Sequence, residues 1–148
     1  MKFRSERGAS VVEFSLVLPL LLVIIFGVVE FGFILYNQAM ITNASREGAR
    51  AGIIIQTPRK STADITSVVN AYLSNYLVTF KSGSPPAPTT VVKINGAEAD
   101  PATAGLVTAQ DFLTVEVRYD YDFLVLPKFI TQITGTKTLF ASSTMRAE

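Results

Sequence analysis

The sequence predicts an α+β fold made of a long N-terminal membrane-spanning helix, a second amphipathic helix and a small antiparallel sheet of about three strands. Three observations predict it. Residues 9–36 hold 21 hydrophobic residues in 28 positions. A later segment repeats apolar residues with the period of a helix, and another alternates them with the period of a strand. Helices followed by a run of strands are typical of α+β domains.

The first element is the membrane-spanning helix of residues 9–36. Phe14–Val29 is a run of 16 residues without a charge, and a helix needs ~20 apolar residues to cross a ~30 Å hydrocarbon core. A secretory signal peptide fits less well, because its apolar region runs ~7–15 residues and ends at an A-x-A-like site. A buried core helix also fits less well, because the rest of the chain is too small to enclose it.

The flanking charges predict the orientation of this helix. Lys2, Arg4 and Arg7 precede it, and the nearest cations that follow it are Arg46 and Arg50. Positive residues stay preferentially on the cytoplasmic side of a membrane. We therefore expect a single pass with the N-terminus in the cytoplasm and the C-terminal domain outside.

Three residues inside this span interrupt its apolar character. A carboxylate costs ~2.5–3.5 kcal/mol at the centre of a membrane helix and less near the ends, where Glu13 and Glu30 lie. We expect Glu30 to reach the lipid headgroups, and Glu13 either to do the same or to pair with a charge on a neighbouring subunit. Pro19 predicts a helix kink, because proline frees one backbone carbonyl and its ring clashes with the preceding turn.

The residues around Glu13 form a motif. Residues 7–14 read RGASVVEF: a basic leader ends in Gly8, and Glu13 and Phe14 follow just before the apolar run. This pattern resembles the prepilin-peptidase site of type IV pilin-like proteins in its Flp/Tad version. The resemblance implies that residues 1–8 are a leader peptide, that the bond between Gly8 and Ala9 is cleaved, and that Glu13 becomes the fifth residue of the mature chain.

A second motif lies further along the same helix. Residues 45–52 read SREGARAG, which resembles the signature of TadE-like proteins. The resemblance implies a type IV pilin-like fold and a pseudopilin or minor pilin that serves assembly of a tight-adherence (Flp/Tad) pilus, and is not an enzyme. The implied partners are a prepilin peptidase, other pilin or pseudopilin subunits and membrane lipid. The implied location is the cytoplasmic (inner) membrane, with entry into an extracellular pilus left open.

The charges created by cleavage suit such a role. Cleavage leaves an ammonium group on Ala9, one helical turn before Glu13. The ammonium of one subunit can pair with the carboxylate of a neighbour that is staggered along the axis. Such a contact would fix the axial register of a helical assembly, which is the best-attested use of a buried charge.

Residues 37–55 are expected to continue the helix outside the membrane. Ala44, Gly48 and Gly52 recur every four residues and therefore share one helix face. Small residues let another backbone approach closely. Two partners remain open for this face, the protein's own sheet and another subunit, and the first is slightly preferred.

Residues 56–148 are expected to form the small α+β domain. Pro58 marks a break before a capping-box pattern at Ser61 and Asp64. A regular apolar period then predicts a helix over Thr62–Val78. β-Branched residues predict a strand over Thr89–Ile94, which ends at an Asn-Gly turn.

The rest of this domain is expected to contain a loop, two strands and a short helix. Ala97–Ala109 is rich in Ala, Thr and Gly and is expected to be a loop. Eleven alternating residues predict the strand Leu113–Phe123 with one wet face. Phe129–Thr134 is expected to form a short helix, and Thr136–Ala147 a last strand.

Composition excludes several classes of function. The chain has no Cys and no His, which removes thiol and Ser-His-Asp catalysis and the usual transition-metal ligands. Its net charge of +1 is unlike that of nucleic-acid-binding domains. We expect no cofactor, no metal, no nucleic-acid partner and no small-molecule substrate. Two alternatives remain: an unprocessed single-pass binding module in the cell envelope, and, less favoured, a membrane-tethered enzyme.

Overall fold

The structure is a computed structural model that describes residues 3–56, 59–79, 87–99, 107–123 and 137–148. In chain order its elements are α1 (Phe3–Ile53), α2 (Thr62–Tyr76), β1 (Thr89–Ile94), β2 (Ala97–Glu98), β3 (Phe112–Tyr121) and β4 (Lys137–Arg146). A long apolar helix, a second helix and one antiparallel sheet confirm the predicted α+β fold.

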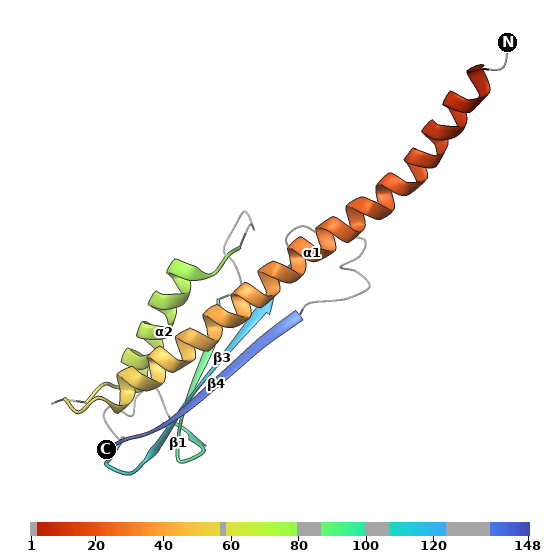
Figure 1. The fold of residues 1–148 in the computed structure, drawn as a ribbon. Coiled ribbons are helices and arrows are strands. Elements are labelled where there is room, and N and C mark those ends of the chain that lie inside the picture. The colour runs from red at the N-terminus through yellow and green to blue at the C-terminus, as the bar shows by residue number, and fades with distance from the viewer. Residues whose placement is uncertain (1–2, 57–58, 80–86, 100–106, 124–136) are drawn as a thin grey trace.

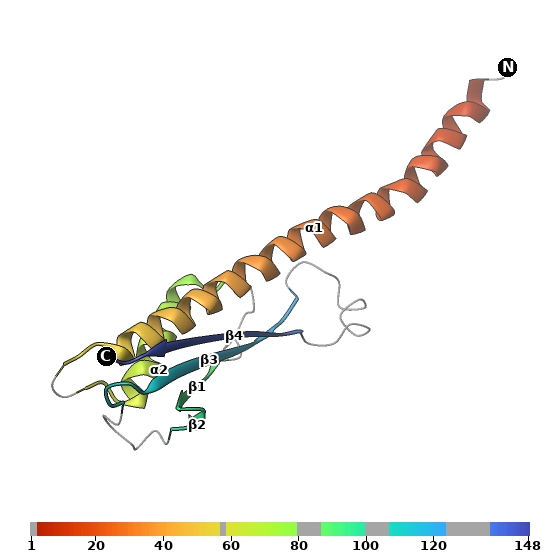
Figure 2. The same ribbon diagram turned by 60° about the horizontal axis from the view of Figure 1, so that its bottom comes forward.

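Helix α1 is one continuous helix of 51 residues, and its two halves have different surroundings. The first half projects away from the rest of the molecule, whereas the second half lies along the sheet (Figure 1). The beginning of α1 and the C-terminus consequently lie at opposite ends of an elongated molecule (Figures 1 and 2). The helix ends at Ile53, two residues before the predicted end of its continuation at residue 55.

Helix α2 begins where the sequence predicts and ends earlier. The hydroxyl of Ser61 accepts a hydrogen bond from the backbone N–H of Asp64, whose carboxylate accepts one from the backbone of Ser61, so the predicted capping box is confirmed. The predicted end at Val78 is wrong, because α2 ends at Tyr76. Leu77 adopts an extended conformation, and the N–H of Val78 donates instead to a side chain of α1.

The sheet has the strand order β2-β1-β3-β4, and all its pairs are antiparallel. Strand β1 has the predicted bounds, and its turn confirms the Asn-Gly signal: Asn95 and Gly96 have φ angles of 52° and 84°, the left-handed values that a tight hairpin turn requires. The turn leads back along β1 and pairs Ala97 with Ile94. Ala97–Glu98 therefore form a short fourth strand, where the sequence predicted only loop.

Strand β3 is the centre of the sheet. Its inward positions, Leu113, Val115, Val117, Tyr119 and Tyr121, are all buried, which confirms the predicted alternation. The strand starts one residue earlier than predicted and ends two residues earlier. Strand β4 pairs with β3 along its whole length and confirms the last predicted strand to within a residue. The predicted short helix at residues 129–134 lies outside the described residues.

The two helices cover one face of the sheet (Figures 1 and 2). The second half of α1 packs across β3 and β4, and α2 packs beside it toward β1. The core between the layers combines apolar residues of every large element: Ile41, Ala44, Ile65, Val69, Leu73, Val92, Leu113, Val115, Val117, Leu139 and Ala141. Phe33 and Ile34 are the first described residues of α1 that pack against this core. None of the described residues in the projecting half of α1 belongs to it.

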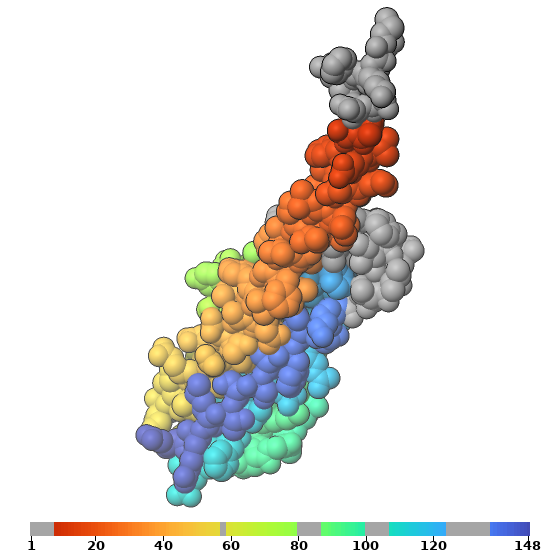
Figure 3. Space-filling view, turned by 45° about the vertical axis from the view of Figure 1, so that its right-hand side comes forward, coloured from red at the N-terminus to blue at the C-terminus, as the bar shows by residue number. Residues whose placement is uncertain are grey.

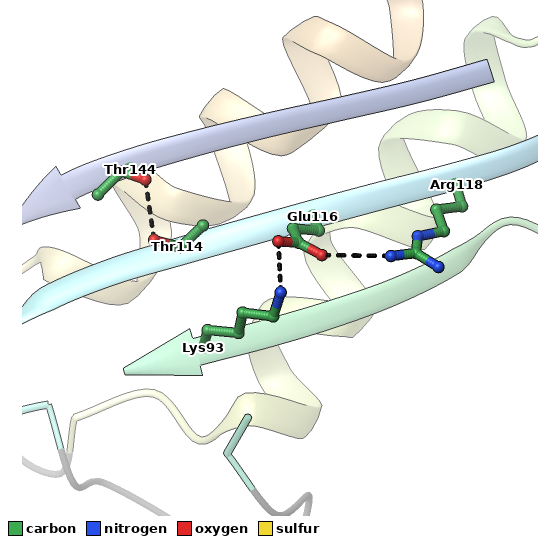
Figure 4. Close-up of polar contacts among 5 residues, drawn as sticks. All are labelled: Lys93, Thr114, Glu116, Arg118 and Thr144. Carbon is green, nitrogen blue, oxygen red and sulfur yellow. Dashed lines mark hydrogen bonds and ion pairs between the residues drawn. The ribbon is translucent and has the colours of Figure 1, made fainter. Parts of the chain in front are cut away.

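The other face of the sheet carries polar pairs between neighbouring strands. The Lys93 ammonium group of β1 donates to the Glu116 carboxylate of β3 at 2.5 Å. The Arg118 guanidinium, which belongs to β3 itself, lies 3.7 Å from the same carboxylate. The hydroxyls of Thr114 and Thr144 are 2.8 Å apart across β3 and β4. Figure 4 shows these side chains standing on the face away from the helices. Cross-strand pairs of this kind each contribute roughly 0.2–1 kcal/mol.

Candidate functional site

The candidate functional site is the exposed half of α1 together with the residues that join α1 to the domain. By length and composition, α1 is the one helix in the described part of the chain that could cross a membrane, and none of its most apolar window is buried. Figure 3 shows this half standing clear of the domain. Val11, Phe14, Leu16 and Leu20 are each more than half exposed. A surface this apolar and this open needs lipid or other protein around it.

The residues of the predicted cleavage motif lie at the beginning of this exposed half. Gly8 and Ala9 are exposed within α1, and no side chain lies within 4 Å of a Cβ built on Gly8. Ala9 and Glu13 are four residues apart and therefore occupy the same face of the helix. Phe14 is 63% exposed. Gly8, Ala9 and Glu13 are therefore all exposed residues of one helix, and cleavage between Gly8 and Ala9 stays a prediction.

Pro19 lies inside α1, and the helix continues on both sides of it. Figure 2 shows that α1 curves along its length. Pro19 has no N–H to donate, so the carbonyl one turn before it lacks its helical partner. The kink at Pro19 stays a prediction.

Glu30 lies in a different environment from the one that the sequence predicts. It was expected to reach the headgroups, but its side chain is 2% exposed and lies against the domain. The Tyr121 hydroxyl donates a hydrogen bond of 2.6 Å to Glu30 Oε1. Burial raises the pKa of Tyr121, and the hydrogen bond and the charge of Glu30 raise it further. The phenol therefore stays protonated and remains a donor at physiological pH.

Asn37 and Gln38 form two further links that the sequence did not predict. The Asn37 side chain donates to the carbonyl of Val78 at 3.1 Å and accepts from its N–H at 3.0 Å. Gln38 Nε2 donates to the carbonyl of Phe140 in β4 at 2.8 Å. One signal could have found them, because two adjacent amides directly follow a long apolar run. Their partners are too far away in the sequence to be named from it.

The small residues of α1 face the protein's own domain. Ala44 is fully buried. A Cβ added to Gly48 would lie 2.5 Å from Val69 Cγ2, and one added to Gly52 would lie 2.7 Å from Ile65 Cδ1. These two neighbours belong to α2, and the Cβ added to Gly52 would also meet Leu113 of β3, so the two glycines let both α2 and the sheet approach α1 closely. Of the two partners left open for this face, the structure shows the protein's own domain lying on it.

Comparison with known proteins finds one family model that matches part of the chain. A family model described as TadE-like protein matches residues 8–50, which confirms the resemblance predicted from the sequence. The matched range starts at Gly8 and covers the exposed half of α1, Glu30, the two amides and Gly48. No curated protein matched the chain, and no solved structure did.

Proposed function

Because residues 8–50 match the TadE-like family, we propose that this chain is a pseudopilin or minor pilin subunit of a Tad/Flp-type adhesion pilus, and that it is processed by a prepilin peptidase after Gly8. One observation carries the proposal: the family match begins at the predicted cleavage residue and runs along a helix whose first half is exposed and apolar. The second half of that helix belongs to a folded domain. The apolar first half of α1 would anchor such a subunit in the membrane, and the second half would hold the folded domain outside it.

The proposed location is the cytoplasmic membrane, with the N-terminus in the cytoplasm. The apolar half of α1 would contact lipid before assembly and other pilin or pseudopilin subunits afterwards. Hydrolysis of the Gly8–Ala9 bond by water leaves a carboxylate on Gly8 and an ammonium group on Ala9. It also removes Lys2, Arg4 and Arg7, whose positive charges would hold the helix on the cytoplasmic side.

Glu13 is the proposed register contact. Its carboxylate would pair with the Ala9 ammonium group of a neighbouring subunit displaced along the helix axis. An unpaired carboxylate among apolar helices is unfavourable, so displacements that leave Glu13 without a cation are disfavoured. The contact therefore selects one axial displacement between subunits whose apolar surfaces would otherwise slide.

Mass spectrometry of the protein from its host tests the processing step. We expect the mature chain to begin at Ala9, and to retain residues 1–8 in cells that lack the peptidase. Gly8→Leu should block cleavage, whereas Gly27→Leu, a matched change at another open position of α1, should leave it intact. A chain that keeps residues 1–8 in the presence of the peptidase would contradict processing and would support the alternative of a permanently anchored binding module.

Pilus assembly tests the register contact. We expect Glu13→Ala to reduce the number of pili about tenfold or more, the effect of losing ~1.4 kcal/mol at one contact. Glu47→Ala is the matched control, because Glu47 is a partly exposed glutamate on the part of α1 that lies beside the domain. Equal pilus numbers in the two variants would argue against a register role for Glu13.

A further inference from the structure

We propose that Glu30 and Tyr121 form a clasp that holds the membrane-proximal end of the sheet against α1 and places the outer boundary of the hydrocarbon core between Val29 and Glu30. The inference requires that α1 crosses a membrane. It does not depend on leader cleavage or on a role in a pilus.

The clasp joins two residues that are 91 positions apart in the chain. Glu30 is 2% exposed and Tyr121 is 1% exposed. The bond between them, at 2.6 Å, has the length expected of a charge-assisted hydrogen bond between a hydroxyl and a carboxylate. Tyr121 is the last residue of β3, and its ring meets Phe123 edge-on with 5.9 Å between centroids. The end of the central strand is therefore fastened to α1 at Glu30.

The surroundings of α1 change at this residue. Val28 is 69% exposed and Val29 is 43% exposed. Glu30 is the first buried residue of α1 among those whose burial is described, and Asn37 and Ile41 after it are fully buried. The domain thus begins to cover the helix at Glu30, well before the predicted end of the span at residue 36.

The domain that packs on α1 from Glu30 onward prevents this part of α1 from entering the bilayer. The ends of the strands carry polar backbone groups, and irregular backbone exposed to lipid is not tolerated in the hydrocarbon core. Because the clasp and the two amides fix the sheet to α1 from Glu30 onward, residues 31–36 cannot enter the bilayer without bringing the domain with them. The domain therefore acts as a stop.

The length that remains matches a bilayer. Ala9 to Val29 is 21 residues, which span ~32 Å at ~1.5 Å per residue, against a hydrocarbon core of ~30 Å. Residues 9–36 would span ~42 Å and would need a strong tilt. Phe31 is 60% exposed and Tyr36 is 40% exposed just beyond Glu30. Phe31 then falls in the headgroup layer, and Tyr36 lies ~10 Å beyond Val29 at the outer side of this layer. Tyrosine is enriched at such interfaces.

The boundary can be measured directly, because the chain has no native Cys. Single cysteines at Val29, Phe31, Leu35 and Ala39 would each carry a fluorophore, in full-length protein reconstituted into phosphatidylcholine–phosphatidylglycerol vesicles. Nitroxide groups on the lipid acyl chains quench only a probe that lies in the hydrocarbon core. We expect strong quenching at Val29 and several-fold weaker quenching at Leu35 and Ala39. Quenching at Leu35 equal to that at Val29 would overturn the proposed boundary.

The clasp itself is tested by hydrogen exchange of the full chain in the same vesicles. We expect Tyr121→Phe and Glu30→Ala each to raise the exchange rate at the end of β3 roughly tenfold, because each removes the same charge-assisted hydrogen bond. Tyr119→Phe is the matched control, since it removes a hydroxyl from the neighbouring inward position of β3 and should change the rate little. The double variant should exchange no faster than the faster single variant, because the two residues act as one unit.

Two results would overturn the clasp. One is exchange at the end of β3 in Tyr121→Phe that is no faster than in Tyr119→Phe. The other is a double variant whose effect is the product of the two single effects, since independent residues combine in that way. Leader processing and pilus numbers are separate measurements, so failure here is distinct from failure of the proposed function.

Discussion

Gly52 shows how a single position is determined by its surroundings. An added Cβ would lie 2.7 Å from Ile65 Cδ1 and would also meet Leu113. Overpacking of this kind typically costs 1–3 kcal/mol, and alanine regains up to ~1 kcal/mol of helix propensity. We therefore expect Gly52→Ala to lower the free energy of unfolding by about 1–2 kcal/mol, measured by chemical denaturation in detergent.

Gly32 provides the control for this prediction. It lies on the same helix, and nothing lies within 4 Å of a Cβ built on it. Gly32→Ala should be neutral or slightly stabilising, because only helix propensity changes. Equal stability of the Gly52→Ala and Gly32→Ala variants would show that α2 can move away from α1 without cost.

Asp111 determines a pH dependence at the turn that leads into β3. Its carboxylate accepts hydrogen bonds from the Thr108 hydroxyl, the Asn95 amide and the Thr108 backbone N–H, and these bonds hold its pKa below the usual range. A lowered folded-state pKa adds stability that is fully present above the unfolded value of ~3.9 and is lost as the pH falls through the folded value. Denaturation curves between pH 6 and pH 2 should therefore have a shallower acid dependence in Asp111→Asn than in the parent. The two chains would show the same acid slope if the turn did not hold the carboxylate.

At the scale of elements, Asn37 joins α1 to the end of α2. Its side chain is fully buried and satisfies both backbone groups of Val78. Asn37→Ala leaves these groups without their partner, which typically costs about 1–3 kcal/mol for a buried group. We expect that loss in thermal unfolding, together with faster hydrogen exchange at Val78. Asn43→Ala, at an exposed position of the same helix, should change neither quantity.

The elements themselves could be predicted wherever the signal is local. The starts of α2 and β1 were correct to the residue, because a capping box and a β-branched run are read from adjacent positions. The end of α2 was wrong because the N–H of Val78 bonds to Asn37, which is 41 residues away. Strand β2 was missed because its two residues have no strand pattern of their own and pair only through the turn at Asn95 and Gly96.

The candidate site follows the same rule: its contiguous motif could be predicted from the sequence, and its contacts between distant residues could not. The motif around Gly8 and Glu13 is contiguous, so the sequence alone indicates it, and the family match covers it. Glu30 was misplaced because its burial depends on Tyr121, and no periodic pattern relates positions so far apart. The sequence did place Tyr121 on the inward face of its strand, but it could not identify the carboxylate that the hydroxyl meets.

At the scale of the whole molecule, we expect the exposed first half of α1 and the domain to be separable. No buried residue precedes Glu30 among those whose burial is described. We expect the fragment from Val29 to Glu148 to be soluble without detergent and to unfold cooperatively within about 5 °C of the full chain, a shift that corresponds to ~1 kcal/mol. Size-exclusion chromatography and circular dichroism check this, and an aggregated or unfolded fragment would show that the domain needs the membrane helix.

The packing of α1 against β4 also has a consequence for the order of events during biosynthesis. Helix α1 ends at Ile53 and β4 begins at Lys137, yet the two pack together. If α1 crosses the membrane as proposed, its second half leaves the membrane during synthesis long before the strands that cover it have been made. Contacts between segments so distant in sequence form slowly, and exposed apolar surface invites aggregation in the meantime. The chain therefore passes through an interval in which α1 is complete and its domain is not.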